Sequence, residues 1–242
     1  MRAVSDGAYP GVVLDRTVVQ MPGYIADIYR AWSATEHSYD YSLWFRGDLD
    51  KLDHTDSSTL QPMADQTVKG YKYIHTLPAQ LTANNWTGNW TREAMEPNKD
   101  SEKIDEQLGG PANHVRATLL GVPNTEVFIG QGVGVGERQR AVFRRKGKEA
   151  TFISVIDPYK ALDVVRSVEP LKVKGPVRAE GLKVVRHDGG TDLIVVRYDP
   201  QSDGEPAAPS SFSGGKTDAL VTIVRYDKTN NIIKSIKTGG SN

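Results

Sequence analysis

The fold class of this chain is decided by residues 9–47, YPGVVLDRTVVQMPGYIADIYRAWSATEHSYDYSLWFRG. The run at 12–21 is apolar and β-branched and ends at Pro22-Gly23, and the run at 24–33 alternates between two faces. After a polar turn at residues 34–36, HSYDYSLWF at 37–45 alternates again. This pattern predicts three consecutive antiparallel strands. So much aromatic surface is buried only when a sheet packs against another layer.

Strand signals become dense again from residue 113 to the end of the chain. Nine β-rich runs follow one another there, most of them separated by Gly, Asp, Asn or Pro. LKVVRHD, LIVVRYD and VTIVRYD are self-similar, which we interpret as adjacent strands of one sheet. No credible long helix interrupts these runs. The sequence therefore predicts an all-β chain folded as a two-sheet antiparallel β-sandwich, supersandwich-like, with few or no helices.

The same signals predict how the chain is divided. Residues 1–8 form an N-terminal segment, and the sandwich covers residues 9–200. A Pro/Gly/Ser-rich stretch at 201–218 is expected to be a flexible loop. Residues 219–242 supply terminal strands of the same sandwich. Residues 48–70 and 93–112 are polar and charged and are expected to be long loops.

Composition narrows the classes of function. The 242 residues contain 30 Lys+Arg and 30 Asp+Glu, so net charge provides no general attraction to polyanions. The absence of cysteine excludes disulfides, thiolate metal sites and a cysteine nucleophile. No apolar run reaches the ~18 residues of a membrane span, and no signal peptide is visible at the start. Without a nucleic-acid-binding motif, neither a nucleic-acid partner nor a membrane is expected.

The opening stretch also resembles a known family. LDRTVV, YIADIYRA and EHSYDYSLWFRGDL resemble the β-sandwich domain of heparinase II/III-like polysaccharide lyases. HVRATLLGVPNTEVFIGQGVG and RRKGKEATFISVIDPYK resemble later strands of that domain, so the resemblance covers about residues 9–170. It implies β-elimination on an acidic, uronate-containing polysaccharide and a periplasmic or extracellular location. In that family the sandwich works with an (α/α) toroid domain, which this sequence lacks.

The resemblance also suggests which residues line the catalytic cleft. His37, Tyr39, Asp40 and His75 are the candidates for catalysis from this chain. Lyases of the family often hold a zinc in the sandwich through histidines and a carboxylate, so zinc is the implied cofactor; its ligands here are unknown. In the family pattern EHTYD-x-x-x-H, Trp44 stands where the last histidine is expected, so this chain departs from the pattern there.

Two further groups are candidates for binding substrate. Asn85-Trp86-Thr87 and Asn89-Trp90-Thr91 form a small repeat, and Trp86, Trp90, Asn85 and Asn89 could form a platform on which a sugar stacks. The alternative for the two tryptophans is core packing.

Six cations fall between residues 138 and 148, and within them Arg144 and Arg145 are candidates to grip carboxylates or sulfates. The alternative is a solvated hairpin rim at Lys146-Gly147-Lys148. Strand alternation also puts Arg144 and Arg145 on opposite faces.

The leading hypothesis is therefore the sandwich part of a polysaccharide lyase, with little or no activity unless a toroid domain completes it. The alternative is a stand-alone carbohydrate-binding or scaffold domain without catalysis. A third reading is a platform for another domain or for a homo-oligomer.

Overall fold

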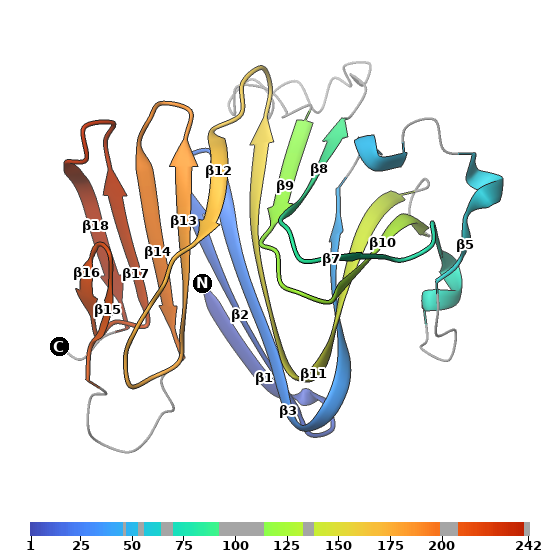
Figure 1. The fold of residues 1–242 in the computed structure, drawn as a ribbon, viewed down its shortest axis with the longest axis horizontal. Helices are drawn as coiled ribbons and strands as arrows, with labels where there is room; N and C mark the ends of the chain where they lie inside the picture. Colours follow the sequence, from blue (N-terminus) through green and yellow to red (C-terminus); the bar gives the residue numbers. More distant parts are fainter. Residues whose placement is uncertain are drawn as a thin grey trace, which may run out of the picture. The chain divides into compact units, whose positions relative to one another are not determined.

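The computed structural model describes residues 1–45, 47–52, 56–63, 70–91, 114–132, 138–198 and 208–239. These residues are mostly β-strand, all pairings are antiparallel, and the only helical elements among them are three short 3-10 turns. The all-β prediction is confirmed. The chain divides into two compact units, Met1–Asp163 and Val164–Asn242 (Figure 1).

The first unit is built on one 11-stranded sheet whose main path is β1-β2-β3-β11-β10-β6-β5. Four further strands join it away from that path: β9 pairs with β11, β8 with β9, β4 with β8, and β7 with β10. Its strands are β1 (Arg2–Tyr9), β2 (Val12–Met21), β3 (Tyr24–Trp44), β4 (Asp48–Leu49), β5 (Gln61–Pro62), β6 (Ile74–Thr76), β7 (Gln80–Thr82), β8 (Trp86–Thr91), β9 (His114–Leu119), β10 (Thr125–Gly132) and β11 (Arg138–Tyr159), and its 3-10 turns are η1 (Asp50–Leu52), η2 (Ser57–Thr59) and η3 (Tyr71–Tyr73).

Two long strands organise this unit, and both correct the sequence prediction. The runs at 24–33 and 37–45 are one continuous strand, β3, rather than two strands joined by a turn. The expected hairpin at residues 146–148 is likewise absent, because β11 runs unbroken through it. β3 and β11 pair with each other along almost their whole length and bend together (Figure 1). The polar residues at 34–36 therefore mark a bend and not a chain reversal.

The bend is produced by a register shift between the two strands. Gly147 pairs with His37, but Glu149 pairs with Trp32, so β3 has extra residues there. Gly147 has φ +147°, a conformation that side chains disfavour. The Tyr39 hydroxyl donates a 3.2 Å hydrogen bond to the Lys148 carbonyl. That bond satisfies a backbone acceptor at the irregularity.

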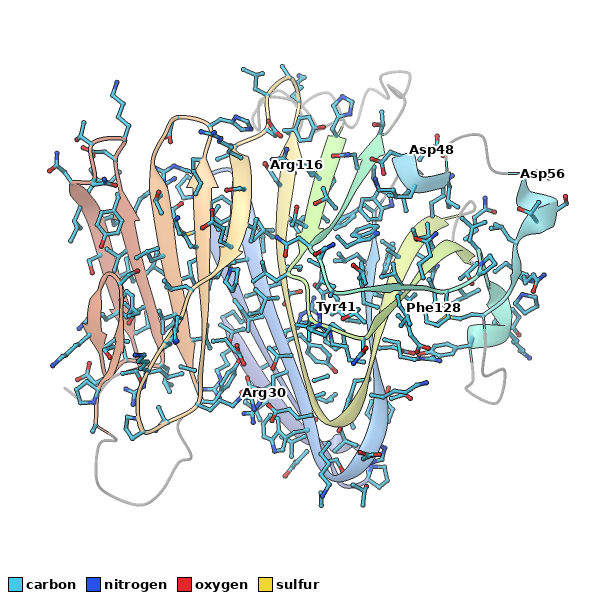
Figure 2. The ribbon with its side chains drawn as sticks, viewed as in Figure 1. Arg30, Tyr41, Asp48, Asp56, Arg116 and Phe128 are labelled. Atoms are coloured by element: carbon cyan, nitrogen blue, oxygen red, sulfur yellow. The ribbon has the colours of Figure 1, made fainter. Side chains whose placement is uncertain are left out.

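The bend folds the sheet into two layers around one core. The N-terminal half of β3 and the C-terminal half of β11 lie in one layer with β2 and β9, and the other halves pair with each other beside β10. Tyr41 and Phe152, from the two layers, stack with their ring centroids 5.4 Å apart. Trp86 and Phe143 meet edge to face at 4.9 Å. Figure 2 shows Tyr41 between the two arms of the bent sheet. The first unit is thus itself a β-sandwich.

The second unit holds a five-stranded sheet in the order β12-β13-β14-β17-β18, with a small β15-β16 hairpin. The three self-similar runs are neighbours in it, as predicted, because β13 pairs with β14 and β14 with β17. The hairpin lies inside the stretch expected to be a flexible loop, whose residues 201–207 are outside the described part. These strands are β12 (Val165–Pro170), β13 (Ala179–Arg186), β14 (Thr191–Arg197), β15 (Ser210–Phe212), β16 (Gly215–Thr217), β17 (Val221–Tyr226) and β18 (Ile232–Thr238).

Across the described residues, no helix has the length and apolar character needed to cross a membrane. The predicted loop at 93–112 lies outside the described residues.

Candidate functional site

Tyr39 and Asp40 are adjacent on β3 and their side chains therefore point to opposite faces of the sheet. Tyr39 belongs to the core between the layers, where burial raises its pKa. Asp40 lies on the outer face of the second layer. There Arg144 donates to both of its carboxylate oxygens at 2.8 Å, and the Tyr71 hydroxyl also donates to it. One substrate group could not contact both side chains in this arrangement.

The two candidate histidines are exposed and lie on different strands. His37 is at the bend of β3, with its Nε2 3.1 Å from the Thr35 hydroxyl. His75 is on β6, opposite Gln131 of β10. The His37 ring does lie near Tyr39, with ring centroids 6.0 Å apart. Asp40 is on the opposite face of β3 and His75 is on another strand, so the structure does not unite the four side chains in one catalytic group.

The described residues do not fit a zinc site. No group of three or more His, Cys, Asp or Glu side chains in the described ranges is arranged to hold a metal ion. His114 instead stacks on Tyr159, with ring centroids 5.1 Å apart, and its Nδ1 is 3.1 Å from the Thr91 hydroxyl. His54, a further histidine considered for such a site, lies outside the described residues.

The prediction of a tryptophan platform for sugars is wrong, because both rings belong to the core. Trp90 is 0% exposed, and its indole N–H donates a 3.0 Å hydrogen bond to the Gln139 carbonyl. Trp86 is half-buried and packs against Phe143. The alternation of Asn-Trp-Thr was correct, but it placed the tryptophans on the inner face and the polar residues on the outer one.

The two asparagines of this repeat are engaged by neighbouring groups. The side-chain Oδ1 of Asn85 accepts a 2.9 Å hydrogen bond from the Gly121 N–H. The Asn89 amide donates to Asp50 at 2.8 Å. Asn89 is directly opposite Arg116 of β9, which pairs with Asp157 at 3.5 Å and also with Asp163. This face is therefore polar, with a single arginine between carboxylates.

The prediction that Arg144 and Arg145 bind a polyanion is also wrong, because both side chains are buried. They do lie on opposite faces, as alternation predicted. Arg144 forms the pair with Asp40, which raises its pKa. Arg145 is buried over the Phe152 ring at 4.5 Å and donates to Thr125 at 2.9 Å and to the Leu120 carbonyl at 3.1 Å.

A network not predicted from the sequence links the segments that carry the family resemblance. Arg16 donates to both oxygens of Asp27, at 2.9 and 2.6 Å. Tyr41 donates to Asp27 at 2.8 Å, and its hydroxyl is 2.7 Å from that of Ser154. Burial and the nearby Asp27 charge raise the pKa of Tyr41. Since Asp27, Tyr41 and Ser154 are buried, these residues stabilise the junction of the two layers rather than forming an open site.

The outer face of the second layer offers a different kind of surface. Phe128 and Val142 pack there with Met63 and Ile74 in a cluster separate from the main core. Trp44 is the last residue of β3 and lies on the same face, directly opposite Arg140 of β11. Trp44 remains 49% exposed. The exposed tryptophan of this unit is therefore not one of the two singled out from the sequence.

Comparisons with protein-family models and with curated proteins find no match for this chain. Any functional proposal therefore depends on the resemblance of the sequence motifs and on the placement of these side chains in the fold.

Proposed function

We propose that this chain is the β-sandwich part of a heparinase II/III-like polysaccharide lyase, and that it contacts acidic polysaccharide without cleaving it alone. The proposal includes a periplasmic or extracellular location and a helical toroid domain, or a second copy of the chain, as partner. The resemblance of residues 9–170 to that family is its starting point.

One observation carries the non-catalytic part of the proposal: the four candidate catalytic side chains do not converge. β-Elimination on a uronate needs a base, an acid for the leaving oxygen and neutralisation of the carboxylate within one site. Here Tyr39 is directed into the core and Asp40 is neutralised by Arg144 on the opposite face. The remaining groups would have to come from a partner domain.

A second observation supports the family assignment. Arg16, Asp27 and Tyr41 come from the three segments that carry the resemblance, and they form one hydrogen-bonded network. The three segments on which the resemblance depends therefore share one structural role, because this network stabilises the junction of the two layers.

The test is to incubate the purified chain with polygalacturonate, alginate and hyaluronan. The unsaturated product is followed by absorbance, and binding is measured by calorimetry on the same samples. We expect binding without elimination. Dextran, a neutral glucan, serves as the control ligand. Elimination by the chain alone would contradict the proposal. So would the finding that the chain binds none of the three acidic polymers.

A stand-alone carbohydrate-binding domain is the second candidate. The exposure of Trp44 favours it, because a surface tryptophan can stack on a sugar without help from another domain. Addition of a separately produced toroid domain distinguishes the two candidates: only the first predicts that elimination appears.

A further inference from the structure

β18 is an edge strand of the sheet in the second unit, and its outer edge pairs with no other strand among the described residues (Figure 1). Six of its seven residues are exposed, so side chains on both of its faces reach solvent. β12, at the opposite edge of the sheet, differs because it buries Val165 and Val168 and ends at Pro170. An open edge of this kind is a template for pairing with another strand.

Two lysines of β18 have no carboxylate partner. Lys234 and Lys237 are both exposed, and neither forms an ion pair within the part of the chain that the structure describes. Lys234 is instead directly opposite Arg225 of β17, whose guanidinium is bound to the buried Asp192 at 3.1 Å. Because the two lysines are three positions apart in a regular part of the strand, they point to opposite faces. Each face of the edge therefore has one uncompensated positive charge.

Exposed isoleucines stand at the start of the same strand. Ile232 and Ile233 are 59% and 57% exposed. Ile233 has no residue opposite it on β17, because the register shifts between Tyr226 opposite Ile232 and Arg225 opposite Lys234. The edge therefore offers apolar surface at one end and positive charge along the rest.

These charges decide what kind of strand fits the edge. A second copy of β18 is a poor partner, because the pair would bring four lysines together and neither strand has a carboxylate. A strand with carboxylates at positions i and i+3 is complementary, since these two side chains also point to opposite faces and reach Lys234 and Lys237.

We propose that β18 is a docking edge for an acidic, extended peptide segment of a partner protein, which joins the sheet as an additional antiparallel strand. Main-chain hydrogen bonds along the edge supply affinity in this mode of recognition, and alternate side chains supply specificity. β-Branched residues of the added strand would cover the exposed isoleucines. The inference goes beyond the lyase proposal and does not depend on it.

The test measures binding of a synthetic peptide, VTEVTEVT, to the full chain by calorimetry. Its two glutamates have the required spacing. VTKVTKVT reverses the charge, and VTEPPEVT keeps the glutamates but contains two adjacent prolines. Because neighbouring N–H groups of a strand point to opposite sides, one of these prolines must remove a donor that faces the edge. We expect binding of VTEVTEVT alone, weaker at higher salt, with slower hydrogen exchange at the β18 amides.

Variants of the two lysines test the charges. Lys234→Gln combined with Lys237→Gln is expected to weaken binding of VTEVTEVT by about 5- to 10-fold. Lys234→Glu combined with Lys237→Glu should exchange the preference, so that VTKVTKVT binds instead. The matched control is Lys172→Gln combined with Lys174→Gln, which removes the same charge from exposed positions between β12 and β13 and should leave binding unchanged.

Three outcomes would overturn the proposal. The first is that the intact chain does not bind VTEVTEVT. The second is that the Lys234 and Lys237 double variant binds it as tightly as the intact chain. The third is that VTEPPEVT binds equally well, because the lysines would then attract charge without strand addition. Polygalacturonate is titrated in parallel: if it binds through these lysines and the peptide does not, the edge is a polysaccharide contact and the docking proposal is wrong.

Discussion

Carboxylates inside the first unit are each held by an arginine from a neighbouring strand. Asp15 and Asp27 are both 1% exposed, and each accepts two hydrogen bonds from one guanidinium, that of Arg2 and that of Arg16. A buried charge without such a partner is strongly unfavourable. These charged residues therefore act in the structure rather than in chemistry on a substrate.

Tyr41→Phe tests the buried network at this scale. The change removes the hydroxyl that joins Asp27 to Ser154 and leaves both without that partner, so we expect a loss of about 1–3 kcal/mol in the free energy of unfolding. Denaturant unfolding followed by fluorescence measures it. Tyr9→Phe is a suitable control, since Tyr9 is exposed. Equal stability of the two variants would show that the network contributes nothing.

Arg144→Ala should cost more. It leaves Asp40 at a mostly buried position, where the two side chains are only 9% and 14% exposed, and removal of one partner of such a pair costs about 3–5 kcal/mol. The double variant Arg144→Ala with Asp40→Ala should recover part of this loss. A double variant that is as unstable as the sum of the two single variants would contradict the coupling.

At the scale of single residues, the sequence predicted the alternation of side chains along a strand but not which face of the strand is exposed to solvent. Alternation correctly separated Arg144 from Arg145, and Trp90 from Asn89. One alternative placed the tryptophans in solvent, whereas the structure buries them. The residues that cover them are distant in sequence: the Trp90 indole donates to Gln139, more than 40 positions away. A local pattern contains no information about such a partner.

At the level of strands, the bend of β3 and β11 is the feature that the sequence misled us about. Polar residues at 34–36 and Lys-Gly-Lys at 146–148 are typical of turns. Both segments nevertheless lie within a single bent strand, because each irregularity is opposite the other in the same ladder. The strands that follow simple turn signals, such as β13, β14 and β17, were predicted correctly.

Gly147→Ala tests the bend. Gly147 has φ +147°, where a Cβ is strained, so we expect a loss of about 1–3 kcal/mol. Gly7→Ala on exposed β1 is the control, because no atom lies within 4 Å of its added Cβ, and it should change stability by less than about 0.5 kcal/mol. Thermal unfolding of both variants measures the difference. An unchanged melting temperature for Gly147→Ala would rule out a strained bend.

For the molecule as a whole, buried tyrosines make the free energy of unfolding depend on pH in the alkaline range. Burial is the first cause of the raised pKa of Tyr29, Tyr39, Tyr41 and Tyr71. An unfolded tyrosine loses its proton near pH 10, before the folded one does. The unfolded state therefore binds fewer protons above that pH, and stability falls as pH rises.

We accordingly expect the free energy of unfolding to be insensitive to these groups below about pH 9 and to decrease steeply above pH 10. Denaturant titrations at a series of pH values measure this slope. Tyr41→Phe, with one titrating group fewer, should show a shallower decline. A slope identical to that of the unchanged chain would mean that Tyr41 titrates normally.

The long-range pairing of β3 with β11 also determines when the chain is able to fold. Asp40 and Arg144 are 104 residues apart in sequence. At a synthesis rate of ~5–20 residues per second, β3 waits about 5–20 s on the ribosome before its main partner exists. During that interval the β2-β3 hairpin presents an unpaired, apolar edge, the kind of surface that associates with other chains. Slow refolding and a dependence of soluble yield on chaperones are the expected consequences of building two layers from a single pair of bent strands.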